Sequence, residues 1–333
     1  MYLINHRIDR LFWFSCFMLM SAYILYEHST NCLAIDLDTM MERHRNLIAG
    51  HSEFFNPWQY RVLAPFMLEG IIQTLNTILP GTPDILPYLL LRFLQNLLLL
   101  YVAFYYYKSL NISNPVVLFT GMMLLCYCIS NSIFQSDLSF NTYFDVIFYL
   151  LAACVILNHQ LYWIIPITFI AALNRETSGF IPFMLITAFV GKGNGELTKN
   201  KWIIAGASLL LFFVVFISIR LAYGYQDAEG IHGMTSPMAY LSFNLSFFRM
   251  YPQLFGTLGL IPFIALIGFG KLPKVLKNWF WLIVPFWFVI HLAKSTAVET
   301  RLFLVPQALI FIPALLYLAE YYFKAQHQSV RNE

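Results

Sequence analysis

The sequence predicts an all-α, polytopic membrane protein, a single bundle of about ten transmembrane helices, with nine to eleven as the expected range. Three observations predict this class. Hydrophobic residues make up 59% of the 333 positions, charged residues make up only 11%, and the mean hydropathy is +0.65. Water-soluble domains contain about 25% charged residues, so this chain has too little polar surface for a soluble globule. A net charge of +3 also excludes a nucleic-acid-binding protein, which needs a concentrated basic surface.

The apolar segments have the length that membrane helices require, since a hydrocarbon core of about 30 Å needs about 20 residues. The first segment, 9–27, has no small-residue cleavage site after it, so we expect a retained helix and not a signal peptide. The further spans are expected at 86–108, 115–133, 142–158, 160–174, 177–191, 201–222, 251–270, 279–294 and 302–321. The spans at 160–174 and 177–191 are short and are separated near Asn174.

The segment 60–80 is apolar, but its polar residues follow a helical period. Glu69, Gln73, Asn76 and Thr77 recur at i, i+4, i+7 and i+8, which is one face of a helix. A helix with such a face lies in the membrane interface. We therefore expect a membrane-parallel helix at about 60–80. Together with a long outer loop it forms an insertion at 28–80 within a single membrane domain, 1–333.

The distribution of lysine predicts the orientation. If 60–80 does not cross, one side of the membrane holds the N-terminus and 11 of the 20 Lys and Arg residues, but only four of the 17 acidic residues. Eight of the nine lysines are on that side. The positive-inside rule then places both termini in the cytoplasm. The compact size and short loops favour a bacterial inner membrane as the location.

The outward side gathers the candidate catalytic acids. Helical spacing covers 33–50, with Asp36 in a capping position and Asp38 and Glu42 on one face. Any of these three carboxylates could act as a general base that removes the proton of an attacking hydroxyl. The alternative is a helix on the membrane surface whose carboxylates are simply solvated.

Arginine dominates the basic residues of the outward side, eight of nine, and its planar fork matches phosphate and carboxylate oxygens. Ionisable residues in or beside membrane spans are costly and commonly functional. The candidate substrate- or phosphate-binding residues are Arg61, Arg92, Arg175, Glu176, Arg220, Glu299 and Arg301. Asp145 also lies just inside a span. The alternatives are that Arg61 reaches the lipid headgroups, and that the adjacent arginine and glutamate residues are ion pairs that fix helix packing.

No cofactor is predicted. His28, His44 and His51 share the first loop with several acidic residues, but their spacing does not support a particular metal site. A divalent metal is therefore conceivable without being supported by the sequence.

The layout resembles that of the GT-C-type integral membrane glycosyltransferases. The resemblance rests on a first span followed by an outer loop with acids (Glu27, Asp36, Asp38, Glu42), a membrane-parallel helix at 60–80, many spans with short connections, and arginine-bearing outer turns at 174–177 and 299–301. It covers most of the chain in architecture and includes no specific motif. In that family the acids follow the first span closely. Here Glu27 does so, whereas Asp36 and Asp38 come about ten residues later, which leaves the base open.

The resemblance implies that a sugar moves from a polyprenyl-phosphate carrier to a lipid or glycan acceptor on the non-cytoplasmic face. A loop carboxylate would be the base and arginines would hold the carrier phosphate. Two other classes stay open. A lipid-linked oligosaccharide polymerase or ligase commonly has its large outer loop later in the chain, whereas here it comes first. A transporter or lipid flippase for an anionic substrate often shows internal repeats, and the sequence shows no convincing repeat.

Overall fold

The computed structural model describes residues 2–31, 37–50, 58–133, 140–190, 197–224, 234 and 236–332, and their side chains from 9 to 324. Within these ranges the chain is helical and contains no strand, which confirms the predicted all-α class. The α-helices are α1 Tyr2–Asn31, α2 Leu37–Ile48, α3 Leu63–Ile78, α4 Leu86–Ser109, α5 Pro115–Ser130, α6 Asn141–Leu157, α7 Ile164–Ala172, α8 Ile181–Ala188, α9 Lys199–Tyr223, α10 Pro237–Ser246, α11 Met250–Leu258, α12 Ile261–Ile267, α13 Lys274–Lys294, α14 Leu304–Pro306 and α15 Ile312–Asn332.

Short 3-10 turns occupy Trp58–Tyr60, Asn131–Ile133, Leu161–Trp163, Glu176–Phe180, Phe269–Lys271 and Thr300–Phe303, and a π-helix occupies Gln307–Phe311. Each predicted span coincides with one helix or with consecutive helical segments. In the described ranges, five helical segments are long and apolar enough to cross a membrane, or six if the bent pair α11–α12 counts as one span. This agrees with a multi-pass membrane protein. The predicted number of about ten is not reached by this criterion. The first predicted span, in α1, is not among these segments, and α6, α7 and α8 have only 17, 9 and 8 residues.

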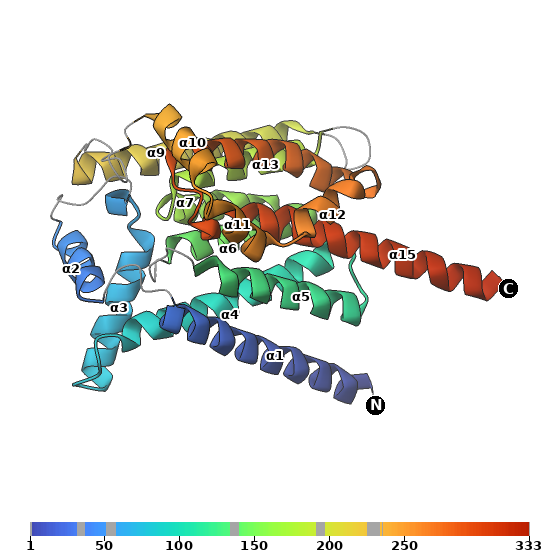
Figure 1. Ribbon diagram of the computed structural model, residues 1–333, viewed down its shortest axis with the longest axis horizontal. Coiled ribbons are helices and arrows are strands. Elements are labelled where there is room, and N and C mark those ends of the chain that lie inside the picture. Colours follow the sequence, from blue (N-terminus) through green and yellow to red (C-terminus); the bar gives the residue numbers. More distant parts are fainter. Residues whose placement is uncertain are drawn as a thin grey trace.

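The helix α3 lies across one end of the bundle, whereas α1, α4, α5 and α15 run along its length (Figure 1). It is not among the helices that could span a membrane. Ala64 and Leu68 on one face are buried, and Gln73, Asn76 and Thr77 on the other are exposed, as the polar period predicted. Both chain ends lie at the opposite end of the bundle (Figure 1).

The helix α4 packs against both α1 and α6. Its Tyr106 and Tyr107 hydroxyls donate hydrogen bonds to the Leu309 and Ala308 carbonyl oxygens, at 2.7 and 3.3 Å. Both carbonyls belong to the π-helix, where the wider turn changes the backbone pairing. The two tyrosines thus provide donors for polar backbone that would be costly to bury unpaired.

The close packing of α5 against α15 involves a glycine at position 121. A Cβ atom added at Gly121 of α5 would lie 2.3 Å from the Leu316 Cδ1 atom of α15. A side chain at position 121 would therefore require the Leu316 side chain to move away.

The start of α3 is attached to the ends of two other helices. The Leu63 backbone N–H donates to the Leu173 carbonyl at 3.0 Å, and the Tyr60 hydroxyl donates to the Gly224 carbonyl at 2.9 Å. These bonds fix the residues just before α3 beside the end of α7 and the end of α9. The polar residues of all three segments therefore meet at this end of the bundle.

Candidate functional site

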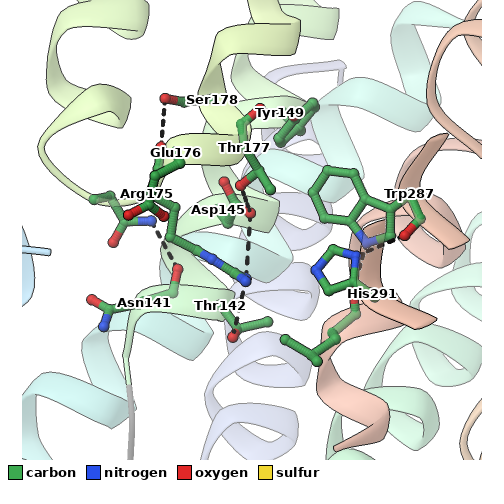
Figure 2. A network of polar contacts seen from close by, with 12 residues as sticks. Asn141, Thr142, Asp145, Tyr149, Arg175, Glu176, Thr177, Ser178, Trp287 and His291 are labelled. Carbon is green, nitrogen blue, oxygen red and sulfur yellow. Dashed lines mark hydrogen bonds and ion pairs between the residues drawn. The ribbon is translucent and has the colours of Figure 1, made fainter. Parts of the chain in front are cut away.

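The most deeply buried ion pair joins α6 to the break between α7 and α8. Asp145, one turn into α6, is fully buried, and Arg175 is 5% exposed. The Arg175 Nη1 atom lies 3.6 Å from Asp145 Oδ2 and 3.4 Å from Thr142 Oγ1 (Figure 2). The Thr177 hydroxyl donates to the same Asp145 oxygen at 2.8 Å. Asp145 therefore orients both the arginine and the threonine of the break.

Side chains also satisfy the backbone of the break. The Asn174 amide donates to the Asn141 carbonyl at 2.8 Å, and the Ser178 hydroxyl donates to the Arg175 carbonyl at 2.7 Å. The Tyr149 hydroxyl donates to the Thr177 carbonyl at 2.5 Å. A non-helical segment inside an apolar bundle needs such partners, because lipid and apolar side chains offer none. These hydrogen bonds stabilise the break and fix the positions of Arg175 and Glu176.

Glu176 joins three parts of the chain. Its Oε2 atom lies 3.4 Å from Arg61 Nη2, just before α3, and its Oε1 atom lies 3.5 Å from Arg220 Nη2, near the end of α9. The Arg220 guanidinium also lies over the rings of Phe216 and Tyr60, at 3.4 and 4.3 Å from their centroids. Burial alone would raise the pKa of the Glu176 carboxyl, but Arg61 and the neighbouring arginines bring this pKa below its ordinary value.

Arg301 and Glu299 form a tighter pair in the turn that follows α13. The Arg301 Nη2 atom is 2.8 Å from Glu299 Oε2, and the Thr296 hydroxyl donates to Glu299 Oε1 at 3.2 Å. The Asn244 side chain of α10 holds the same turn. Its amide donates to the Leu292 and Ser295 carbonyls at 2.8 and 2.9 Å, and its oxygen accepts from the Ala297 N–H.

Arg92 of α4 is fully buried and contacts aromatic rings and an amide. Its guanidinium lies 4.2 Å from the Tyr143 ring centroid and 4.9 Å from that of Phe140. Its Nη1 atom donates to Gln95 Oε1 at 3.0 Å. Cation–π contact and an amide acceptor stabilise this buried charge.

The arginines are close enough to influence one another. Burial and then the positive charge of Arg61 lower the pKa of Arg175 to about 10, and Arg301 contributes in the same direction. Arg175 therefore stays protonated at neutral pH but carries unfavourable positive neighbours. The charges of Arg92 and Arg301 both act on His28. We call Arg61, Arg92, Arg175, Arg220 and Arg301 the arginine cluster, and the end of the bundle that holds it the arginine end.

The candidate acids of the first loop lie apart from this cluster. Asp38 and Glu42 are exposed on α2, and among the described residues neither forms an ion pair with an arginine of the cluster. Asp36 lies outside the described residues. The helix α2 is attached through His44, whose Nε2 atom lies 2.9 Å from Glu69 Oε2 of α3. The face with Asp38 and Glu42 thus fits the solvated alternative.

The sequence predicted the arginines as site residues, but Asp145, Thr142 and Thr177 were not among the predicted site residues. Asp145 could have been selected because it is an acidic residue one turn inside an apolar helix. Burying such a charge is costly unless it has a partner. Figure 2 also shows Trp287 and His291 of α13 beside this network. The Trp287 indole donates to the Leu302 carbonyl at 2.6 Å, and the two rings stack with centroids 5.0 Å apart.

No group of three or more His, Cys, Asp or Glu side chains that could hold a metal ion is present in the part of the chain that the structure describes. There, His28 Nε2 contacts the Ile129 carbonyl at 3.0 Å and His44 contacts Glu69, while His51 lies outside these ranges. Comparison with family models, curated proteins and solved structures gave no match to this chain.

Proposed function

We propose that this protein is a membrane glycosyltransferase that moves a sugar from a polyprenyl-phosphate donor to a lipid or glycan acceptor. The main observation that supports this proposal is the arginine cluster. Its guanidinium groups come from five separate parts of the chain. Arg61 and Arg220 share Glu176, the charges of Arg61 and Arg301 act on Arg175, and those of Arg92 and Arg301 act on His28. Replacing a buried ion pair by well-packed apolar residues is commonly neutral or stabilising, so stability alone gives no reason to keep the buried pairs of Arg175 and Arg301. Phosphate recognition does give a reason to keep the arginines, because the guanidinium fork matches phosphate oxygens.

In the proposed reaction, the hydroxyl oxygen of the acceptor attacks the anomeric carbon of the sugar. The bond from that carbon to the phosphate oxygen breaks, and the polyprenyl phosphate leaves with the electron pair. The hydroxyl proton passes to a carboxylate of the first loop, for which Asp36 and Asp38 are the candidates. The arginines neutralise the charge that builds on the departing phosphate, a type of stabilisation whose loss commonly costs about 10²–10³ in rate.

The proposal includes an orientation in the membrane. We propose about ten passes, with α3 in the interface, both termini in the cytoplasm and the arginine end on the non-cytoplasmic face of a bacterial inner membrane. The position of both termini at one end of the bundle supports an even number of passes (Figure 1). The lysine-rich composition of that same side supports its cytoplasmic location.

The test is release of sugar from a panel of synthetic polyprenyl-phosphate sugars by the purified full chain in detergent. Arg61→Gln and Arg220→Gln are the informative arginine variants, because both residues are partly exposed and neither neutralises a fully buried acid. Asp36→Asn and Asp38→Asn are compared with each other to identify the base. Lys271→Gln, which changes an exposed lysine held by Tyr322 of α15, is the matched control.

We expect turnover of one donor, a loss of about 10²-fold in each arginine variant, and a loss in one of the two aspartate variants. The control variant keeps full activity. Equal turnover in the wild type and in all the arginine and aspartate variants would contradict the proposal. If no donor is turned over and none raises the thermal stability of the protein, the transferase proposal fails.

A second candidate is transport of an anionic lipid or solute. The observation that favours it is the bend of 66° between α11 and α12, together with the break between α7 and α8, since transporters build substrate sites from interrupted helices. A liposome assay distinguishes the two functions. Movement of a fluorescent prenyl phosphate between leaflets without any sugar release would favour transport.

A further inference from the structure

The acid–arginine pairs of the arginine end differ in how closely they are joined. Hydrogen bonds between a guanidinium and a carboxylate are normally about 2.7–2.9 Å long. Arg301 and Glu299 meet this value at 2.8 Å, whereas Glu176 lies 3.4 Å from Arg61 and 3.5 Å from Arg220. Glu176 is thus shared between two arginines and makes an optimal bond with neither.

The loosely held carboxylate is also the accessible one. The side chain of Glu176 is 29% exposed and that of Arg220 is 23% exposed, whereas Arg175 and Asp145 are 5% and 0% exposed. The Nε atom of Arg61 is buried and has no hydrogen-bond partner among the described residues. An anion that reached this place would therefore find an unused donor on Arg61, which shares the carboxylate of Glu176 with Arg220.

We propose that Glu176 is a built-in competitor for an anionic ligand: its carboxylate occupies the position between Arg61 and Arg220 that a phosphate group takes when it binds. A carboxylate and a phosphate present similar oxygen pairs to the guanidinium fork, so one can replace the other. The Glu176 carboxylate then loses its contacts with both Arg61 and Arg220. The chemical class of ligand, a phosphate ester of a prenyl lipid, rests on the proposed function.

Competition of this kind affects donor and product differently. A sugar–phosphate diester has one negative charge, so it replaces the carboxylate charge for charge. The prenyl monophosphate that remains after transfer has a second ionisation near pH 6 and carries close to two negative charges at neutral pH. Without Glu176, the nearby Arg61, Arg175 and Arg220 would hold this product strongly. The returning carboxylate lowers the affinity of the product and so favours its release.

The test is binding of farnesyl monophosphate to the purified full chain in detergent, measured by isothermal titration calorimetry. Wild type is compared with Glu176→Gln, which keeps the shape of the side chain and removes its charge. Glu320→Gln is the matched control, because Glu320 also loses a charge but lies by Ser113, Asn114 and Lys324, away from the cluster. We expect the dissociation constant of Glu176→Gln to fall about tenfold, and that of the control to stay unchanged.

A dissociation constant in Glu176→Gln that equals or exceeds that of the wild type overturns the proposal. Should this variant not fold, Glu176→Asp is used, which keeps the charge but moves it away from the arginines. We then expect an affinity between those of the wild type and a fully neutral side chain. An affinity in Glu176→Asp at or below the wild-type value overturns the proposal as well.

Two further ligands identify the source of the phosphate. If inorganic phosphate gains as much affinity as farnesyl monophosphate from Glu176→Gln, the phosphate group alone is recognised, and the inference holds for a soluble ligand. Farnesol carries no charge and should gain nothing, and an equal gain for farnesol overturns the inference. If Glu176→Gln binds more tightly but the assay above shows neither sugar release nor stabilisation by any donor, the proposed function is rejected and this inference stands.

Discussion

The two ends of the bundle hold their basic residues in opposite surroundings. At the arginine end, Arg92, Arg175 and Arg301 are 0–5% exposed and contact acids, amides and aromatic rings. At the other end, Lys271 and Lys324 contact the second half of α15, which leads to the C-terminus. We call this the lysine end. Lys324 is 59% exposed and pairs with Glu320 one helical turn away.

This difference follows from the chemistry of the two side chains. A guanidinium is planar, weakly hydrated and able to form several hydrogen bonds, so it can be buried beside acids and rings. An ammonium is strongly hydrated and stays at the surface. The lysine end therefore has the character of a solvated membrane boundary, whereas the arginine end has the character of a binding site.

The largest effect is expected for Arg175→Met, which leaves the carboxylate of Asp145 buried without its charged partner. Breaking one side of a buried pair costs about 3–5 kcal/mol of stability. The measurement is the free energy of unfolding in mild detergent. The double variant Arg175→Met with Asp145→Leu should recover most of the loss, because both charges are then gone. If the double variant is as unstable as the single one, the two residues do not act as a pair.

A smaller loss is expected for Arg61→Ala, which removes a charged contact that attaches the start of α3 to Glu176. Hydrogen bonds to charged groups contribute about 1.5–3 kcal/mol, and this partly exposed contact of 3.4 Å should fall at or below the lower limit. We expect faster proteolytic cleavage near α3, with unchanged cleavage at the lysine end. Uniform cleavage along the chain would indicate global unfolding and would contradict the local role.

The attachment of α2 to α3 should depend on pH. The hydrogen bond from His44 lowers the pKa of Glu69 below the ordinary value of 4.5, with a further contribution from Gln73. A lowered pKa means that the stabilisation is present above the unfolded-state value and is lost as the pH falls through the folded-state value. Protection of α2 against pepsin should therefore decrease as the pH is lowered below 4.5, and Glu69→Gln should show little change over this range.

The smallest effect is expected at the lysine end. Lys324→Ala removes an exposed ion pair, and such pairs contribute about 0–1 kcal/mol. The Glu320 carboxylate keeps its hydrogen bonds from the Ser113 hydroxyl, at 2.8 Å, and the Asn114 N–H, at 3.1 Å. A loss as large as that of Arg175→Met in the same unfolding assay would remove the contrast between the two ends.

The helices and the crosswise course of α3 could be predicted from the sequence, because both depend on local periodicity. The polar residues of 60–80 repeat with the helical period and so predict one exposed face, and the structure has this face. The arginine residues could also be selected, since their cost inside a membrane protein is a property of each residue alone.

The partners of the arginines could not be predicted in the same way. Asp145 is 30 positions from Arg175, and Arg61 reaches Glu176 across 115 positions, so these pairs depend on tertiary packing. The sequence pairs Arg175 with its neighbour Glu176, whereas in the structure Arg175 lies against Asp145 and Glu176 turns to Arg61 and Arg220. The exposure of Asp38 and Glu42 on α2 likewise depends on which face meets α3.

The most direct test of the central claim, that the arginine end binds a lipid-linked phosphate, is the change in the unfolding temperature when farnesyl monophosphate is added. Two double variants are compared with the wild type. Arg61→Gln with Arg220→Gln changes the arginine end. Lys271→Gln with Lys277→Gln changes the lysine end, where Lys277 donates to the Gly270 carbonyl next to Lys271 at 2.6 Å. The ligand should raise the unfolding temperature of the wild type and of the lysine variant, and leave that of the arginine variant unchanged. An equal rise in both variants, or no rise in the wild type, would contradict the claim.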